Sequence, residues 1–422
     1  MKTALKSSMK LGLLTSLYFS QGLPFGFFTQ ALPVLLRKQG LSLPAIGLAN
    51  LLALPWALKF LWAPVMDRYG SERLGRRRGY ILPLQLLSAA LLLGLALPEG
   101  SASVPTLLVA MLLVNLLAAT QDVATDGLAV DLLEPEELGW GNGIQVAGYR
   151  VGMIVGGGVM LLIFDALGWR PTLVSLGVLL LVATVPVALF REPPSRAPRS
   201  TEGSLGRWLR EALLYWVRRP GAGTWFLLLV LFKAGESLAT GMLRTFLVDA
   251  GLGLSQVGWM LGFVGFTTGL LGALVGGALV HRLGQRRALL VFGTLQAGAV
   301  LLYAWAARGG AGLAVLTLVC GVEHLTSGMA TAALFTGMMG LCRAEHAASD
   351  YTVQASLVVM ATGGAAAVSG FSAQALGYAW HFTLAAALCG VAVAWVALTF
   401  PSPRRLAPSP PGAVTTRPIT GG

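Results

Sequence analysis

The sequence Asp67-Arg-Tyr-Gly70, followed by Arg76 and Arg77, has a counterpart in the second half of the chain. There the sequence is His281-Arg-Leu-Gly284, followed by Arg286 and Arg287. A second pair of matching stretches lies ahead of these: Gly40-Leu-Ser-Leu-Pro-Ala-Ile-Gly47 and Gly251-Leu-Gly-Leu-Ser-Gln-Val-Gly258. The two matches are offset by 214 and 211 residues. Similar offsets for separate motifs indicate that the chain contains a duplicated unit.

Composition places this unit in a membrane. The chain has 422 residues, of which 55% are hydrophobic and only 11% are charged, and its mean hydropathy is +0.72. Soluble domains carry about 25% charged residues, so these charges are too few to cover the surface of a soluble enzyme. Disorder is excluded as well, because disordered chains have low hydrophobicity and high charge. We therefore expect a polytopic membrane protein.

Twelve apolar segments can be distinguished, and a spanning helix needs about 20 apolar residues. Their ranges are 11–36, 45–66, 80–97, 105–131, 141–164, 171–190, 223–249, 255–280, 288–306, 311–341, 351–376 and 380–400. Each copy of the duplicated unit holds six segments. We predict an N-terminal six-helix bundle (1–190), a cytoplasmic linker (191–222), a C-terminal six-helix bundle (223–400) and a disordered cytoplasmic tail (401–422).

The net charge of +12 fits the orientation of these segments better than binding to nucleic acid. With the N-terminus in the cytoplasm, 22 of the 30 Lys and Arg residues fall in cytoplasmic segments and four in outer loops. Cytoplasmic loops carry an excess of positive charge, so we predict that both termini are cytoplasmic. Anionic-lipid binding is the alternative role for the basic linker. We expect no cleavable signal peptide, since Met1–Lys10 runs directly into a full-length span.

The sequence gives no sign of a metal, a nucleotide or an enzymatic centre. Cys320, Cys342 and Cys389 form no CxxC pair or zinc spacing. The three glycines at 156–158 follow no predicted strand and precede no Lys-Ser or Lys-Thr, as a phosphate loop would require. The four histidines are scattered, so no nucleophile–base pair is indicated. We expect no cofactor and no enzymatic activity.

The duplicated six-helix plan and the Asp-Arg-x-Gly loop with its following arginines resemble the major facilitator superfamily (MFS). This resemblance implies an all-α membrane fold, with 12 transmembrane helices in two six-helix pseudo-symmetric halves. It also implies that Asp67, Arg68, Arg76 and Arg77 are gating residues, which pair across the halves in one conformation only. For the arginines, an inside-positive loop with a helix cap is the alternative. Because His281 replaces the acid in the second copy, we expect that copy to be weaker.

Longer motifs narrow the resemblance. They are Ser20-Gln-Gly-Leu-Pro24, Lys59-Phe-Leu-Trp-Ala-Pro-Val-Met-Asp-Arg-Tyr69, Ala119-Thr-Gln-Asp-Val-Ala-Thr-Asp126 and Glu323-His-Leu-Thr-Ser-Gly-Met-Ala-Thr-Ala-Ala333. Over most of residues 11–400, the chain resembles the AmpG-like muropeptide permeases and the related acetyl-CoA transporter family.

Several functional expectations follow from this second resemblance. It implies secondary active, proton-coupled import of anhydro-muropeptide-like solutes by alternating access across a bacterial inner membrane. The proton gradient would supply the energy, and the chain would act as a monomer on a small polar or anionic substrate. Transport of acetyl-CoA or another organic anion is the alternative, and a membrane sensor with a transporter fold is the non-transport alternative.

Four charges in the first half lie at one depth. A charge near the bilayer centre costs at least about 2.5–3.5 kcal/mol, so it normally faces a cavity or a partner. At about 1.5 Å per residue, Lys59, Asp122, Asp126 and Arg150 share a depth band on spans two, four and five. They predict one buried network. Two carboxylates one turn apart disfavour simultaneous ionisation, so Asp122 and Asp126 are proton-coupling candidates; the alternative is a permanent network that fixes the spans together.

The second half offers two further proton-coupling candidates, Glu236 on span seven and Glu323 on span ten. The MFS resemblance implies that both spans line the cavity. The alternatives are an i,i+3 salt bridge between Lys233 and Glu236 and a protonated interhelical carboxyl at Glu323. Buried amides donate and accept hydrogen bonds, which suits sugar or peptide groups, although they also fasten helices together. The predicted substrate-binding residues are Gln21, Lys59, Gln121, Arg150 and Lys233.

Overall fold

Long apolar stretches become helices here because a helix satisfies its own backbone hydrogen bonds inside a bilayer. The computed structural model describes residues 7–32, 36, 52, 54–71, 73–97, 103–193, 205–309 and 311–400. In these ranges the chain is helical apart from short turns, and its β-structure is a single isolated bridge between Ser71 and Gly75. The predicted tail at 401–422 and the motif at 40–47 lie outside the described residues.

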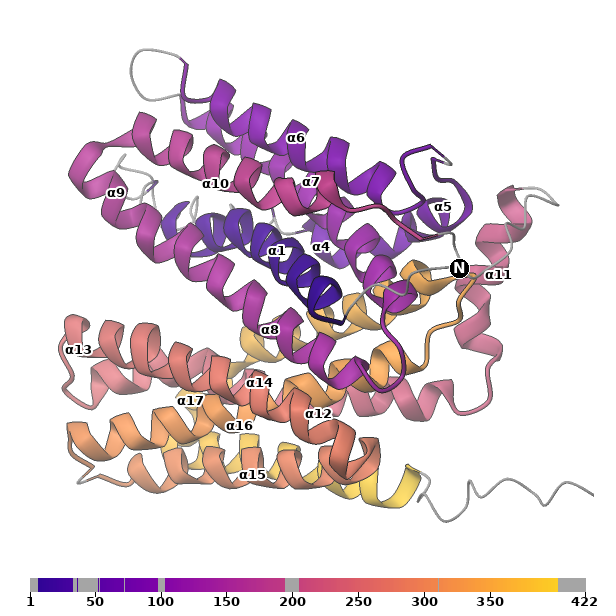
Figure 1. The fold of residues 1–422 in the computed structure, drawn as a ribbon. Coiled ribbons are helices and arrows are strands. Elements are labelled where there is room, and N and C mark those ends of the chain that lie inside the picture. Colours follow the sequence, from indigo (N-terminus) through magenta and orange to yellow (C-terminus); the bar gives the residue numbers. More distant parts are fainter. Residues whose placement is uncertain are drawn as a thin grey trace, which may run out of the picture.

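The first half runs from α1 to α10 (Figure 1). Its elements are α1 (Ser7–Gly26), η1 (Phe27–Ala31), α4 (Leu54–Leu58), η3 (Lys59–Leu61), α5 (Ala63–Arg68), α6 (Arg78–Gly94), α7 (Val104–Leu132), α8 (Leu138–Ile154), η4 (Val155–Val159), α9 (Met160–Leu167) and α10 (Trp169–Leu189). The segments η1 and η4 are π-helical, and η3 is a 3-10 turn.

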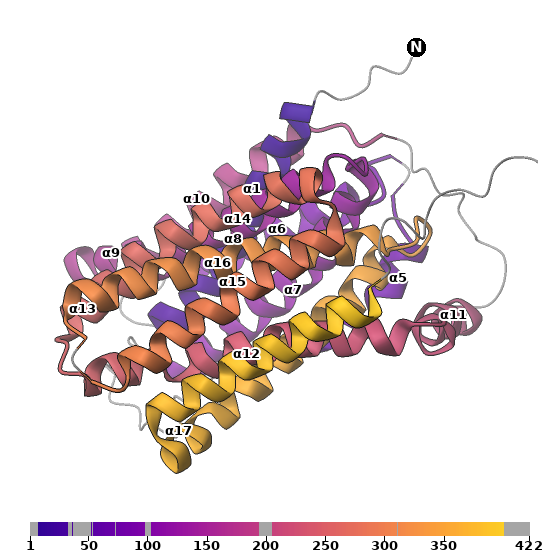
Figure 2. The same ribbon diagram turned by 90° about the horizontal axis from the view of Figure 1, so that it is seen from below.

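The second half runs from α12 to α17 and lies beside the first (Figures 1 and 2). Its elements are α12 (Ala222–Asp249), α13 (Leu254–Gly258), η5 (Trp259–Val264), α14 (Gly265–Leu283), α15 (Gln285–Ala306), α16 (Leu313–Gly340) and α17 (Ala347–Thr399). The helix α11 (Leu205–Arg218) lies between the two halves in sequence.

The helices match the twelve predicted spans. Eight helical stretches among the described residues are long and apolar enough to cross a membrane. One of them, α17, has 53 residues and changes direction at Gly377, where φ is 73°, a conformation that glycine adopts without strain. It therefore supplies two spans. The shorter α6, the helix α1 with η1, and the broken stretch α4–η3–α5 supply the first three spans.

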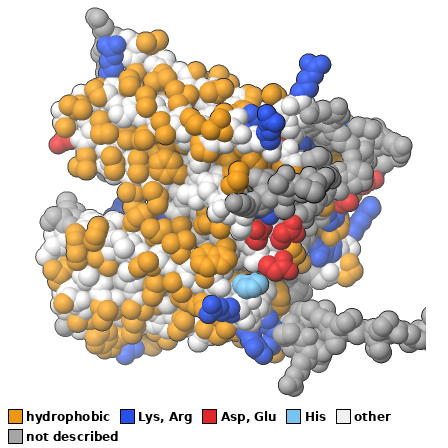
Figure 3. Space-filling model, in the orientation of Figure 1, with side chains coloured by type: hydrophobic (Ala, Val, Ile, Leu, Met, Phe, Trp, Pro, Cys, Tyr) orange, Lys and Arg blue, Asp and Glu red, His pale blue; other side chains and the backbone are white. Residues whose placement is uncertain are grey.

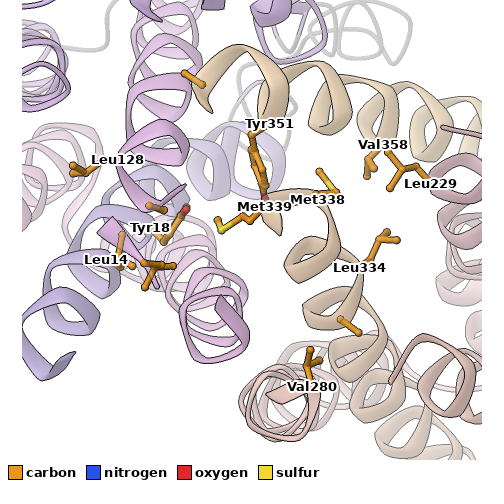
Figure 4. Packing of buried hydrophobic residues seen from close by; sticks show 14 of the residues in the cluster. Leu14, Tyr18, Leu128, Leu229, Val280, Leu334, Met338, Met339, Tyr351 and Val358 are labelled. Atoms are coloured by element: carbon orange, nitrogen blue, oxygen red, sulfur yellow. The ribbon is translucent and has the colours of Figure 1, made fainter. Parts of the chain in front are cut away.

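The two halves meet along two seams. In one seam α8 packs against α14, and in the other the start of α17 packs against α4, η3, α5 and α7. The core continues through this contact, as Figure 4 shows: Tyr351 of α17 lies beside Met339 of α16 and faces the first half. We call the end with the α5–α6 and α16–α17 connections and α11 the basic end; it is at the right of Figure 1. At the opposite end Figure 3 shows a hollow between the halves.

The predicted linker contains an ordered helix, α11. The indole Nε1 of Trp208 donates to the carbonyl of Pro64 in the first half at 2.9 Å. The same indole ring stacks on His346 of the second half, with ring centroids 4.2 Å apart. In α11, apolar residues recur at helical spacing between the arginines. They form an apolar face that can pack against the rest of the protein. Composition indicated a polar linker without this helix, because averaging over 191–222 conceals its period.

Glycine permits the closest helix contacts in the first half. A Cβ at Gly156 would lie 1.9 Å from the carbonyl oxygen of Leu23, whereas a Cβ at Gly158 would meet no atom within 4 Å. Both residues belong to η4, so they differ in contact but not in backbone conformation. Gly156 is therefore required by the approach of α1, and Gly158 is not.

We predict that Gly156→Ala lowers the stability of the purified protein by about 1–3 kcal/mol, the usual cost of overpacking. Gly158→Ala, the matched control, should change it by no more than about 0.5 kcal/mol. Thermal unfolding in detergent measures both. Equal effects of the two substitutions would show that the α1 contact does not limit residue 156.

Candidate functional site

A buried cluster built around charged residues connects four spans of the first half, α1, the stretch with η3, α7 and α8. Lys59 donates to the carboxylate of Asp122, and its Nζ lies 4.0 Å from Oδ2 of Asp126. Tyr18 donates to Oδ1 of Asp126 at 3.1 Å, and the amide of Gln145 donates to the same oxygen at 3.3 Å. All five residues are buried. Low local dielectric strengthens such bonds and makes an unpaired charge costly.

The chain presents Lys59 at a break in the second span. Pro64 has no N–H, so it cannot donate to the carbonyl one turn earlier, and its ring clashes there. The helix is accordingly interrupted by the 3-10 turn of η3 before it continues as α5. The Lys59 ammonium also lies 5.7 Å from the centre of the Trp56 ring, a favourable cation–π distance.

Arg150 lies apart from this cluster, so the prediction of one four-residue network is wrong for this residue. Its guanidinium packs against Gly269 of α14, and the acids whose charges act on it are Glu236 and Glu323. Arg150 follows Gln145 by five residues, which rotates its side chain by about 140° around α8. The prediction rested on depth along a helix axis, and depth does not determine the direction of a side chain. In the described part of the chain, Arg150 forms no ion pair.

The second half holds its own polar cluster. Lys233 and Glu236 of α12 form the i,i+3 pair that the spacing allowed. Ser327 of α16 donates to the Glu236 carboxylate, and Lys233 donates to Oγ1 of Thr331 at 3.1 Å. The cluster thus connects spans seven and ten. Ser327 and Thr331 belong to the motif at 323–333, but their residue types did not mark them as site residues, because hydroxyl residues are common within apolar helices.

Glu323 is buried, and its Oε2 lies 2.7 Å from Nδ1 of His324 without hydrogen-bond geometry. His324 Nδ1 is also 3.0 Å from the backbone carbonyl of Cys320. These contacts give Glu323 a titratable neighbour next to it in sequence.

The two predicted amides have different surroundings. Gln121 donates to Oγ of Ser20 at 3.0 Å, and Gln85 donates to the same oxygen at 2.8 Å. Gln121 therefore fastens α7 to α1 in this conformation. Gln21 is fully buried, and both polar atoms of its amide lack a hydrogen-bond partner among the described residues. Such a group normally has an explanation in a bound water or ligand.

Asp67 joins the two halves at the basic end. Its carboxylate accepts hydrogen bonds from the backbone N–H groups of Ala348 at 3.2 Å and Ser349 at 2.7 Å, and from the Ser349 hydroxyl. Ala348 and Ser349 belong to the first turn of α17, where free N–H groups and the helix dipole attract an anion. The sequence pointed to Asp67, but its partners in the second half could not be inferred from their residue types.

The three arginines near Asp67 make different sets of contacts. Arg77 donates to Asp67 at 2.7 Å and to Asp131 at 3.1 Å. Burial opposes the charge of Arg77, but these two carboxylates outweigh it and raise the pKa of the guanidinium. Arg76 donates to the backbone carbonyls of Asp67 and, at 3.3 Å, of Glu345 in the second half. Arg68 lies over the ring of Tyr69 at 5.8 Å.

The second copy of the loop caps a helix, and among the described residues it forms no hydrogen bond to the first half. Arg286 donates to the carbonyls of Ala397 and Phe400 at 2.9 Å each, at the end of α17. Arg78 does the same at the end of α10, donating to Val187 at 2.9 Å and Ala188 at 2.6 Å. His281, by contrast, is exposed, and no described residue of the first half bonds to it. The acid is therefore specific to the first copy.

Two pseudo-symmetric helix bundles with charged residues in the interior are the architecture of a membrane transporter. The sequence profile of the Major Facilitator Superfamily matches residues 14–368. The chain belongs to the major facilitator superfamily and, within it, to the AmpG-like permeases.

Known proteins support this assignment. The chain is 30% identical to the anhydromuropeptide permease of Escherichia coli K12 over 90% of its own length and 78% of that protein. It is 22% identical to a chain named AmpG 4 in Rickettsia conorii, over 79% of its length and 83% of that chain. The crystal structure of the human organic anion transporter MFSD10 has the same fold. That structure superposes with a TM-score of 0.75 and 15% identity, covering 93% of this chain and 99% of the human one.

We predict that Lys59→Met destabilises the folded protein by about 3–5 kcal/mol, since it leaves two buried carboxylates without their cation. This loss of stability should be smaller at low pH, where protonation neutralises the two carboxylates. It should grow as the pH rises. Lys10→Met is the control, because Lys10 pairs with Glu137 at 2.8 Å near the surface; it should cost no more than about 1 kcal/mol. Thermal unfolding in detergent over a pH series measures both, and a pH-independent loss at Lys59 would contradict the prediction.

Proposed function

We propose that this protein imports anhydromuropeptide-like solutes across a bacterial inner membrane, driven by the proton gradient. The observation that carries the proposal is the 30% identity with the anhydromuropeptide permease over 90% of the chain. No cofactor takes part in the proposed mechanism, because the gradient supplies the energy. We further propose that the monomer is the transporting unit, since each chain has both halves of the site.

The arrangement of the halves supports alternating access. The described hydrogen bonds between the halves lie towards the basic end, and they include bonds from Asn142 to Met339 and from Gln145 to Tyr351. The hollow lies at the other end (Figure 3). This is the geometry expected when the site is closed on one side and open on the other.

The basic end is the cytoplasmic end in this proposal. Cytoplasmic segments are enriched in Lys and Arg, and the α5–α6 connection and α11 are both rich in arginine. Closure at this end with an opening at the other is then an outward-open state, which is the state that receives a solute from the periplasm.

The interior charges suit a polar, anionic cargo. Arg150 has no ion-pair partner among the described residues and lies where the two halves meet, so it is available to a carboxylate of the cargo. Lys59 and Lys233 are already paired with acids, and they become available only if those acids take up protons. The proposed proton-coupling residues are Asp122, Asp126, Glu236 and Glu323.

We predict that cells lacking their own permease take up labelled anhydromuropeptide when they produce this protein, and that a protonophore abolishes the accumulation. Arg150→Met should reduce uptake by about tenfold or more, because a lost charge-assisted contact costs about 1.5–3 kcal/mol. Arg170→Met, which alters an exposed arginine at the start of α10, is the control. Accumulation that survives the protonophore would contradict proton coupling, and uptake of other organic anions alone would identify a different cargo.

We predict that Asp67→Ala opens the basic end. The native Cys342 is partly buried near this contact and serves as the probe. The substitution removes buried hydrogen bonds worth about 1 kcal/mol each. Cys342 of the variant in nanodiscs should therefore react with a maleimide several times faster than in the parent protein. Cys320 and Cys389 would be replaced by alanine. Asp249→Ala is the matched control, because Asp249 accepts a bond from Tyr378 within the second half. An unchanged rate in Asp67→Ala would refute a gating role.

A further inference from the structure

The structure assigns the coupling proton to Asp126 and its link to the gate to a hydrogen-bonded chain through Gln145 and Tyr351. This inference rests on the proposed proton coupling and specifies which acid acts and how its protonation reaches the contact between the halves.

Asp122 and Asp126 are held in different ways. Asp122 accepts a direct hydrogen bond from the Lys59 ammonium. Asp126 lies 4.0 Å from that ammonium and receives its hydrogen bonds from neutral groups, the Tyr18 hydroxyl and the Gln145 amide. Like charges one turn apart disfavour simultaneous ionisation, so one carboxyl takes the proton more readily. The acid without the direct cation contact is Asp126.

A chain of bonds leads from Asp126 to the second half. The Gln145 amide that donates to Asp126 also lies 3.0 Å from the Tyr351 hydroxyl, and that hydroxyl is 3.3 Å from Oε1 of Gln145. Tyr351 lies in the first turns of α17, two residues after Ser349, which bonds to the gating residue Asp67. Among the described parts of the chain, Asp126 is thus the one proton candidate whose hydrogen bonds reach the other half through a single side chain.

Protonation changes the strength of this chain. A carboxylate accepts charge-assisted hydrogen bonds that are roughly twice as strong as neutral ones. When a proton binds to Asp126, the bonds from Tyr18 and Gln145 lose that assistance. Gln145 is then less firmly held in the position that meets Tyr351, so the start of α17 separates more easily from α8. Deprotonated Asp126 therefore favours a closed basic end, and protonated Asp126 favours an open one.

The groups that face Asp126 come from every element packed around it. They are Tyr18 of α1, Lys59 of η3, Asp122 of α7, Tyr149 of α8, Tyr351 of α17 and Cys342 of the turn before α17. In this set, Tyr351 is the group that belongs to the second half and is also hydrogen-bonded to Gln145, which donates to Asp126. It is a positioning residue, since it acts through Gln145.

The experiment measures gate opening without any cargo. Spin labels on Arg73→Cys and Ala344→Cys, exposed residues of the two halves at the basic end, report the distance across it. Cys320, Cys342 and Cys389 are replaced by alanine, and the protein is reconstituted in nanodiscs. Between about pH 8 and about pH 5, we expect the open fraction of the parent protein to rise about fivefold, a usual size for coupling between sites.

Three variants test the chain. Asp126→Asn should make the open fraction independent of pH. Tyr351→Phe keeps the ring and removes the hydroxyl, and it should raise the open fraction at about pH 8 and reduce the pH response by at least about half. Tyr378→Phe removes a hydroxyl bonded to Asp249 within the second half and should leave the response intact.

The outcomes are separable from those of the proposed function. A parent protein without a pH response, or a Tyr351→Phe variant with the full response, would overturn the inference even if uptake remains proton-driven. Asp126→Asn with a retained response would move the proton to another acid and also overturn it. Loss of proton-driven uptake in the parent would refute the proposed function, whatever the labels report.

Discussion

The carboxylate of Asp67 at the start of α17 is the interaction on which this arrangement of the two halves depends. An anion at a helix N-terminus is stabilised by free N–H groups and by the helix dipole, and here the anion belongs to one half and the helix to the other. When the halves separate, Asp67 loses its hydrogen bonds to α17 and its carboxylate is no longer buried. The contact therefore has two states, formed and broken. A contact with two states is what the proposed rocking of the two bundles would need at one end.

Each of the four interior acids has a different set of interaction partners. Asp122 has a direct cation, Asp126 has two neutral donors, Glu236 has a lysine and a serine, and Glu323 has a histidine. The bilayer makes an unpaired charge expensive, so each partner determines how easily its acid becomes neutral. In the proposed mechanism, these different partners would allow one acid to take up a proton while another stays charged.

At the basic end, α11 adds a third contact between the halves. Its Trp208 bonds to the first half and stacks on His346 of the second. Burial and the neighbouring Arg343 guanidinium lower the pKa of His346, which keeps the stacked ring neutral at ordinary pH. The linker therefore stabilises the same closed state as Asp67.

The lengths of the apolar segments and the repeated motifs let the sequence determine the twelve spans, the duplicated halves and the family resemblance. The free-energy cost of placing a charge in the bilayer pointed to the acids and lysines that are buried. Hydrophobic length and charge cost are local properties, and they can be read from neighbouring residues. Only the tertiary structure decided that Arg150 lies against Gly269 of the second half, that Ser349 donates to Asp67, and that Gln145 joins Asp126 to Tyr351. The direction of a side chain depends on the rotation of its helix against distant helices, and that rotation is set by packing between residues far apart in the chain.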